Sequence, residues 1–207
     1  TEYADSGNPL ACVIGGFDKC FLHGIGLEAI MPTGIPELTF AMFQCMFALI
    51  TPALILGAFA ERVKFSGYVL FTILWVIIAY LPMAHWVWGG GWLSSLGFHD
   101  FAGSTAVHMV GGVAALIGAI ILGPRIGKYT KDGKSKAIPG HNLTVGALGV
   151  FILWFCWFGF NGASTVSMEG DAIVTAGKIF VTTNLAAAVA TAVSYTHLRA
   201  HETCADL

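Results

Sequence analysis

The sequence predicts an all-α, polytopic integral membrane protein with about five transmembrane helices. Hydrophobic residues make up 56% of the 207-residue chain and charged residues only 11%, whereas a soluble domain carries about 25% charged residues. The apolar residues are gathered into uncharged runs that are long enough to cross about 30 Å of hydrocarbon as helices. These runs are continuous rather than alternating, which argues against a transmembrane barrel. The net charge of −2 gives no indication of a nucleic-acid partner.

Five apolar runs predict the spans. We expect helices at about 38–60, 66–88, 103–123, 141–160 and 171–193. Gly89-Gly90-Gly91 ends the second run and Asn161-Gly162 ends the fourth, while Lys178 interrupts the fifth. Lengths near 20 residues are those that a membrane-spanning helix requires.

The two ends of the chain differ from this transmembrane domain, which we expect to cover residues 38–193. Residues 1–37 are rich in glycine and carry scattered acids, so we expect a structured loop rather than a span. The chain begins at Thr1 without a basic signal-peptide region, and we expect it to start inside a longer protein. The apolar pattern ends before the tail Ser194–Leu207, and this tail resembles translated adapter sequence. We therefore expect this tail to be non-native and to contribute no site.

The basic residues predict the orientation in the membrane. The connections 61–66 and 124–141 together hold seven of the ten Lys and Arg residues. Because positively charged loops stay in the cytoplasm, we expect both connections to be cytoplasmic and residues 1–37 to be external. Cys12 and Cys20 would then lie on the oxidising side, where a disulfide and two thiols are equally expected.

A histidine, His108, lies inside the third run, which has no Asp, Glu, Lys or Arg from Phe101 to Pro124. Small residues recur with it at helical spacing, namely Ser104, Gly111, Gly112, Ala115, Gly118 and Ala119, while Val107, Val110, Ala114, Ile117 and Ile121 are expected largely on the other side. A stripe of small residues lets a neighbouring helix approach closely, so we expect His108 to point into the bundle. It is then either hydrogen-bonded between two helices or part of a transport pathway, and its position inside a membrane favours the pathway.

Asp100 directly precedes this helix, and two interpretations are open. An aspartate at a helix start is typical of an N-cap. As a buried anion, it would instead make the binding of a nearby cation more favourable. The two roles are compatible, because a cap on an inward-facing helix end still projects negative charge.

Three stretches are rich in aromatic residues: TFAMFQCMF at 39–47, MAHWVWGGGW at 83–92 and WFCWFGFNGAS at 154–164. Aromatic belts at the membrane–water interfaces explain many of these rings. A belt does not explain the phenylalanine stripe beside a glutamine in the first stretch. It also does not explain Phe-Asn-Gly-Ala-Ser at a helix end in the third.

Six motifs along the chain resemble the ammonium transporter family of Amt, Mep and Rh proteins: GIPELTFAMFQ, GAFAERVKFS, PMAHWVWGGG, DFAGSTAVHMVGG, PGHNL and WFGFNGAS. They occur in the family's order and spacing between about residue 7 and residue 193. The resemblance implies eleven transmembrane helices in two inverted-topology halves, with one pore in each subunit of a trimer. This chain resembles the third to seventh helices of that bundle.

The resemblance also implies roles for individual side chains. Phe47 and Trp88 match the aromatic cage that recruits the cation, with Phe43 alongside. Ser164 matches the hydroxyl that accepts a hydrogen bond from the bound cation. Phe47 and Phe160 match the stacked ring pair that closes the pore below this site. These are the expected substrate-binding and gate residues.

Asp100 matches the family's buried acid, and His108 matches the first of two paired pore histidines, the second of which belongs to helices outside the resemblance. The implied function is ammonium transport across the cell membrane, in which ammonium is recruited and deprotonated and ammonia passes a hydrophobic, histidine-lined pore. No cofactor or metal is implied. The implied partners are the lipid bilayer, further copies in a homotrimer, and a PII-type signalling protein at the cytoplasmic face, where the loop 124–141 lies.

Three functions other than transport are open to comparison with the sequence. An ammonium-sensing domain of a signalling protein stays open, and a native C-terminus encoding a kinase or cyclase would decide it. A Rh-like gas channel is also open, although the match at Trp88 favours the ammonium-binding branch. A membrane enzyme with His85, His99, His108 and His141 as metal ligands is disfavoured, because no two of them have the close spacing of a metal site. We therefore expect no enzymatic activity.

Overall fold

The computed structural model describes the backbone of residues 9–205 and the side chains of residues 10–195. The described chain is helical, and its only β-type pairings are two isolated bridges, Ile30 with Pro36 and Tyr129 with Ser135. The elements are η1 Pro9–Cys12, η2 Cys20–Leu22, α1 Glu37–Phe59, α2 Phe65–Trp75, η3 Val76–Tyr80, α3 Leu81–Trp88, α4 Trp92–Ser95, η4 Ser104–Met109, α5 Val110–Leu122, α6 Leu143–Gly162, η5 Ala163–Thr165 and α7 Asp171–Ala205.

Five helical segments in the described chain have the length and composition of membrane spans. They are Glu37–Phe59, Phe65–Ser95, Ser104–Leu122, Leu143–Thr165 and Asp171–Tyr195. The prediction of five spans from the uncharged runs is confirmed, because each expected span lies on one of these segments. Within the second segment, α2, η3 and α3 follow one another without a break from Phe65 to Trp88.

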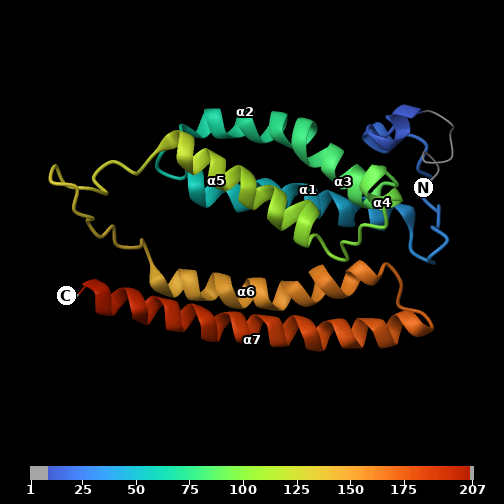
Figure 1. Cartoon of the computed structure of the whole chain (residues 1–207). Coiled ribbons are helices and arrows are strands. Elements are labelled where there is room, and N and C mark those ends of the chain that lie inside the picture. Colours follow the sequence, from blue (N-terminus) through green and yellow to red (C-terminus); the bar gives the residue numbers. More distant parts are fainter. Residues whose placement is uncertain (1–8, 206–207) are drawn as a thin grey trace. The chain divides into compact units, whose positions relative to one another are not determined.

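The chain forms two compact units, Thr1–Pro139 and Gly140–Leu207. In the first unit α1 packs along α5, and Figure 1 shows the two helices side by side. Buried side chains recur every four residues along α1, at Phe47, Thr51, Ile55 and Phe59. This spacing places the four side chains on one face of the helix.

Two glycines let α5 approach that face. A Cβ at Gly111 would lie 3.1 Å from the Thr51 carbonyl oxygen, and a Cβ at Gly118 would overlap the ring of Phe59. Both glycines are buried, as a close helix–helix contact requires. The expectation that this helix packs against protein through small residues is therefore confirmed at these two positions.

The predicted stripe of small residues differs from the structure in its first turn. Val107, expected on the far side, is completely buried, whereas Ser104, expected within the stripe, is exposed. The reason is that η4 is a π-helix, in which the His108 N–H donates to the Gly103 carbonyl five residues back at 2.9 Å. Such a turn contains more residues than an α-helical turn, so the helix before α5 does not follow its 3.6-residue period.

The N-terminal segment is tied to the end of α3, as expected for a structured loop. The imidazole Nε2 of His85 lies 2.7 Å from the Ala11 carbonyl oxygen, and the Trp86 indole donates to the Val13 carbonyl at 2.7 Å. Cys12 and Cys20, whose pairing the sequence left open, are thiols and form no disulfide in the described part of the chain.

The second unit is a hairpin of α6 and α7, joined through η5 (Figure 1). Two side-chain hydrogen bonds hold it together, from Trp154 Nε1 to Asn184 Oδ1 at 3.1 Å and from Asn161 Nδ2 to Thr183 Oγ1 at 2.9 Å. Helix α7 continues to Ala205, into the tail that the sequence predicts to be non-native. The origin of that tail stays a prediction.

Candidate functional site

Three aromatic rings meet at the end of α3. Phe43 and Phe47 lie one turn apart on α1, with ring centroids 4.8 Å apart and planes at 86°. Trp88, the last residue of α3, lies with its ring centroid 5.5 Å from that of Phe47. We call Phe43, Phe47 and Trp88 the aromatic cluster. The structure therefore brings together three of the residues that the resemblance singles out.

Two residues of the connection to the next span, Asp100 and Gly103, fix the indole of Trp88. Its Nε1 donates to the backbone carbonyl of Asp100 at 2.7 Å. Gly103, with φ 101°, packs beneath the ring, where a Cβ would lie 3.4 Å from Trp88 Cη2 and 2.7 Å from Val107 Cγ2. Only glycine fits there, because both the backbone angle and the space exclude a side chain.

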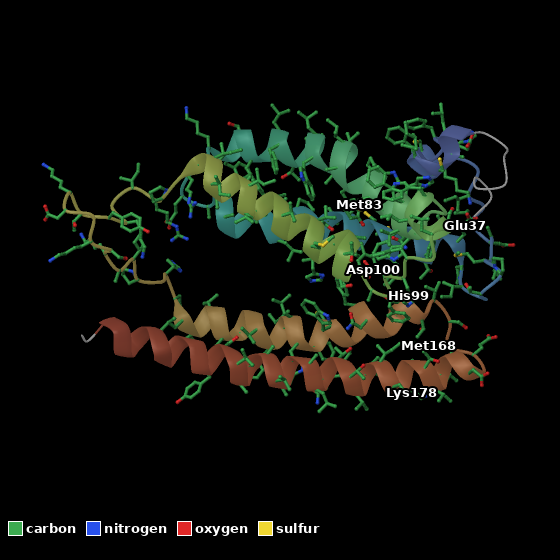
Figure 2. All side chains as sticks on the ribbon, viewed as in Figure 1. Glu37, Met83, His99, Asp100, Met168 and Lys178 are labelled. Carbon is green, nitrogen blue, oxygen red and sulfur yellow. The ribbon has the colours of Figure 1, made fainter. Side chains whose placement is uncertain are left out.

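The carboxylate of Asp100 accepts hydrogen bonds from four backbone N–H groups at the start of η4. Oδ1 accepts from Gly103 at 2.8 Å and Ser104 at 3.0 Å, and Oδ2 accepts from Thr105 at 2.8 Å and Ala106 at 2.9 Å. Figure 2 labels Asp100 beside this end of the helix. Asp100 therefore bonds this helix end and is buried, with 7% of its surface exposed. Its predicted role in favouring a bound cation stays a prediction.

One detail of the cap differs from the prediction. Asp100 does not occupy the N-cap position, which belongs to Gly103. It lies three residues earlier and bonds all four leading N–H groups, which otherwise have no partner within a helix. The left-handed conformation of Gly103 folds the chain back so that this is possible.

These hydrogen bonds stabilise the ionised form of the Asp100 side chain. Burial alone would raise the pKa of the carboxyl, but the four backbone N–H groups outweigh burial and hold the pKa below its ordinary value of 3.8. The side chain is therefore an anion at neutral pH. Within the described residues it forms no ion pair with a basic side chain, so its charge is stabilised by backbone dipoles.

His108 lies within η4, and its Nδ1 is 3.1 Å from the carbonyl oxygen of Gly103. A carbonyl only accepts, so this contact requires the proton on Nδ1 and makes Nε2 the lone-pair nitrogen of the neutral ring. The contact lies at the start of the histidine's own helix, and a bond between two helices stays a prediction. The pathway role stays a prediction.

Ser164 and Phe160 lie in the second unit, at the end of α6. The Ser164 hydroxyl donates to the Phe160 carbonyl at 2.7 Å, and the ring of Phe160 stacks on Trp157 with centroids 5.3 Å apart. The expected pairing of Phe160 with Phe47 spans the two units, and so does the expected approach of Ser164 to the aromatic cluster. Both stay predictions.

Sequence reasoning missed Gly103 as a site residue. Gly103 packs against the Trp88 ring. Its N–H donates to the Asp100 carboxylate, and its carbonyl oxygen lies next to Nδ1 of His108. The available signal was the glycine in DFAGST, because glycine is the residue type that adopts a left-handed conformation without steric cost. No group of three or more His, Cys, Asp and Glu side chains suited to a metal ion occurs in the region that the structure describes.

Comparison with known proteins assigns the class of this helical membrane chain. The model of the Ammonium Transporter Family matches residues 6–203, which is nearly the whole chain. The chain therefore belongs to the ammonium transporter family and is a multi-pass membrane protein. The match extends into the tail that the sequence predicts to be non-native.

Individual relatives agree with this assignment. The ammonium transporter of Bacillus subtilis is 45% identical over 177 residues, which are 85% of this chain and 41% of the relative. The ammonium transporter Amt1 of Archaeoglobus fulgidus is 41% identical over 184 residues, covering 89% of this chain and 43% of the relative. The chain thus spans less than half the length of these curated relatives.

Two solved structures have the same fold. A sensor Amt protein superposes with a TM-score of 0.78 at 39% identity, covering 89% of this chain and 45% of that one. The Mep2 protein of Candida albicans superposes with a TM-score of 0.67 at 35% identity, covering 78% of this chain and 35% of that one.

Proposed function

We propose that the full-length protein transports ammonium across the cell membrane. The observation that carries the proposal is the aromatic cluster, with the Trp88 indole held by the carbonyl of a buried, ionised Asp100. Ring faces attract a cation through their quadrupole, by about 2 kcal/mol when the contact is desolvated. Ammonium resembles K⁺ in size, so this contact and hydrogen bonding supply a discrimination that diameter alone does not.

Ser164 completes the proposed recruitment site, a role that the family resemblance implies. Its hydroxyl hydrogen is engaged by the Phe160 carbonyl. Because a hydroxyl has one donor and two acceptor lone pairs, the oxygen keeps the capacity to accept an N–H from ammonium. The anionic carboxylate of Asp100 adds a favourable potential for a cation at the cluster.

Below the site, the proposed path carries ammonia rather than ammonium. Phe47 and Phe160 form the proposed gate, and a bare cation is costly in such an apolar lumen while neutral ammonia is not. The proton is removed at the gate and handled separately, with His108 and a second histidine of the full-length protein as the relay. The Nδ1 contact with Gly103 supports this role because it sets which ring nitrogen presents a lone pair.

The remaining family properties complete the proposal. The full-length protein is a homotrimer in the plasma or inner membrane, with residues 1–37 external and the loops 61–66 and 124–141 cytoplasmic. A PII-type signalling protein binds at that cytoplasmic face. These statements rest on the resemblance and on the distribution of basic residues.

Transport is tested with the full-length protein in proteoliposomes, by imposing an ammonium or a potassium gradient and recording the current and the internal pH. We expect a response to ammonium that saturates with concentration and none to potassium. Protein-free liposomes control for passive diffusion of ammonia. A response no larger than that control would contradict transport.

A second experiment separates the relay from a structural role of His108. We expect His108→Glu to keep conduction but to admit potassium, because a fixed carboxylate stabilises a cation where the neutral imidazole passes ammonia. Unchanged selectivity for ammonium over potassium in this variant would refute the relay.

A sensor is the second candidate function, favoured by the similarity to the solved sensor Amt protein. In that case the full-length protein would carry a cytoplasmic signalling module, and ammonium would change the activity of this module. The native C-terminus decides between the two functions. A kinase or cyclase module with ammonium-dependent activity, in a protein without transport, would establish sensing.

A further inference from the structure

Three successive residues of the N-terminal segment contact the end of α3 through their backbone carbonyl oxygens. We call them the docking segment: Ala11, Cys12 and Val13. The Ala11 carbonyl lies 2.7 Å from His85 Nε2, and the Val13 carbonyl accepts a hydrogen bond from the Trp86 indole at 2.7 Å. Ala11 is buried, with 5% of its surface exposed. The docking segment is therefore bound to two neighbouring side chains of α3.

The Cys12 carbonyl packs against Gly91, in the turn that follows α3. A Cβ at Gly91 would lie 3.1 Å from this oxygen and 2.6 Å from the Trp86 Cα. The second separation is shorter than the contacts of real Cβ atoms, so a side chain does not fit at this position. The glycine thus lets the docking segment lie directly on the chain that follows Trp88.

His85 joins the docking segment to the turn that carries Trp88. Because a carbonyl only accepts, the contact with Ala11 requires the proton on His85 Nε2. The backbone carbonyl of His85 accepts from the N–H groups of Gly89 and Gly91, at 2.9 Å and 3.1 Å. Trp88 lies three residues after His85 and directly before Gly89. One residue therefore connects the docking segment with the helix end at Trp88.

The position of Trp88 needs support from outside its own helix. Trp88 is the last residue of α3 and is followed by three glycines, the residue type with the greatest backbone freedom. Its hydrogen bond to the Asp100 carbonyl holds the ring from the following connection, whereas the docking segment holds the last helical turn. A ring that is ordered before a ligand arrives loses less freedom on binding, so this support favours affinity.

We propose that His85 is a positioning residue, which holds the last turn of α3, and with it Trp88, against the docking segment. Its effect on recruitment rests on the proposed function, because the aromatic cluster is the proposed ammonium site. The docking itself is independent of that function. Loss of the His85 contact leaves the rings of the cluster present but less ordered, so the affinity for ammonium falls while the rate at saturation is kept.

The test compares His85→Ala with His85→Gln in the full-length protein. Alanine removes the donor, whereas glutamine carries an amide N–H that can reach the same acceptor. His23→Ala is the matched control, because the His23 ring contacts the Asp18 carbonyl within the N-terminal segment. Hydrogen–deuterium exchange of peptides covering residues 9–15 and 85–92 measures the docking. The ammonium dependence of transport in proteoliposomes measures recruitment.

We expect both peptides of His85→Ala to exchange about fivefold faster and its half-saturating ammonium concentration to rise about fivefold, the equivalent of one net hydrogen bond. The maximal transport rate per folded protein should stay unchanged. His85→Gln should reverse most of both effects, and His23→Ala should behave like the wild type. Trp86→Phe loses the donor to Val13 but keeps a ring, and it should show the same changes if His85→Ala folds poorly.

Unchanged exchange of the 85–92 peptide in His85→Ala would overturn the docking. Faster exchange with an unchanged half-saturating concentration, or a loss of maximal rate alone, would overturn the positioning role. Absence of transport in the wild type would refute the proposed function instead, and exchange alone would then decide whether His85 holds the last turn of α3.

Discussion

The indole N–H of Trp88 donates to the backbone carbonyl of Asp100 at 2.7 Å, while the carboxylate of the same aspartate bonds the first four N–H groups of the next helix. One residue thus positions a ring of the aromatic cluster and the start of the helix that carries His108. A change at Asp100 is therefore expected to affect both recognition and folding.

The first prediction concerns Asp100→Asn in the full-length protein. Asparagine has a single side-chain acceptor, and its amide NH2 would face two of the four N–H donors. We expect a loss of about 1–3 kcal/mol of stability, the usual effect of unsatisfied buried groups, together with weaker transport. Thermal unfolding in detergent and ammonium flux measure the two effects. Wild-type melting and flux would show that the carboxylate charge of Asp100 is needed neither for folding nor for transport.

The second prediction concerns pH. The pKa of Asp100 is lowered by folding, so its contribution to stability is present in full above the ordinary value of 3.8 and is lost as the pH falls through the folded value. The difference in unfolding temperature between wild type and Asp100→Asn should be constant near neutral pH and shrink below pH 3.8. A difference that grows on acidification would contradict the lowered pKa.

The third prediction concerns the contact of α1 with α5. Gly118→Ala places a methyl group into the buried ring of Phe59, and overpacking of this kind costs about 1–3 kcal/mol. Gly112→Ala is the matched control, because nothing lies within 4 Å of its Cβ position, and alanine favours a helix by up to about 1 kcal/mol. Thermal unfolding of both variants should move in opposite directions. Equal behaviour would mean that the two helices do not pack at Gly118.

The fourth prediction concerns orientation. A single cysteine at the exposed Ser135, in a background without other cysteines, should resist a membrane-impermeant thiol reagent in intact cells and react after permeabilisation. A cysteine at the exposed Asp18 should react from outside in the same background. Ready labelling of the cysteine at position 135 in intact cells would contradict the proposed topology.

The spans could be predicted from the sequence because their signal is local. Apolar runs place all five spans, and Gly89 marks where α3 ends. The buried side of the first turn of the third span could not be predicted, because the π-helical turn before Val110 changes which residues are buried, and composition does not reveal it.

The candidate site, too, could be predicted only in part from the sequence. The residue types near Asp100 predict a cap, but its reach to four N–H groups depends on the left-handed Gly103, a tertiary arrangement.

The half-saturating ammonium concentration of Trp88 variants is the most direct test of whether the aromatic cluster recognises ammonium. Trp88→Leu removes the ring face and should raise this concentration about 30-fold, which corresponds to a desolvated cation–π contact of about 2 kcal/mol. Trp88→Phe keeps a ring but loses the hydrogen bond to Asp100, and should give a smaller rise. Both proteins are compared at equal folded yield in proteoliposomes. An unchanged half-saturating concentration in Trp88→Leu would contradict recognition by the cluster and leave Trp88 as an interfacial residue.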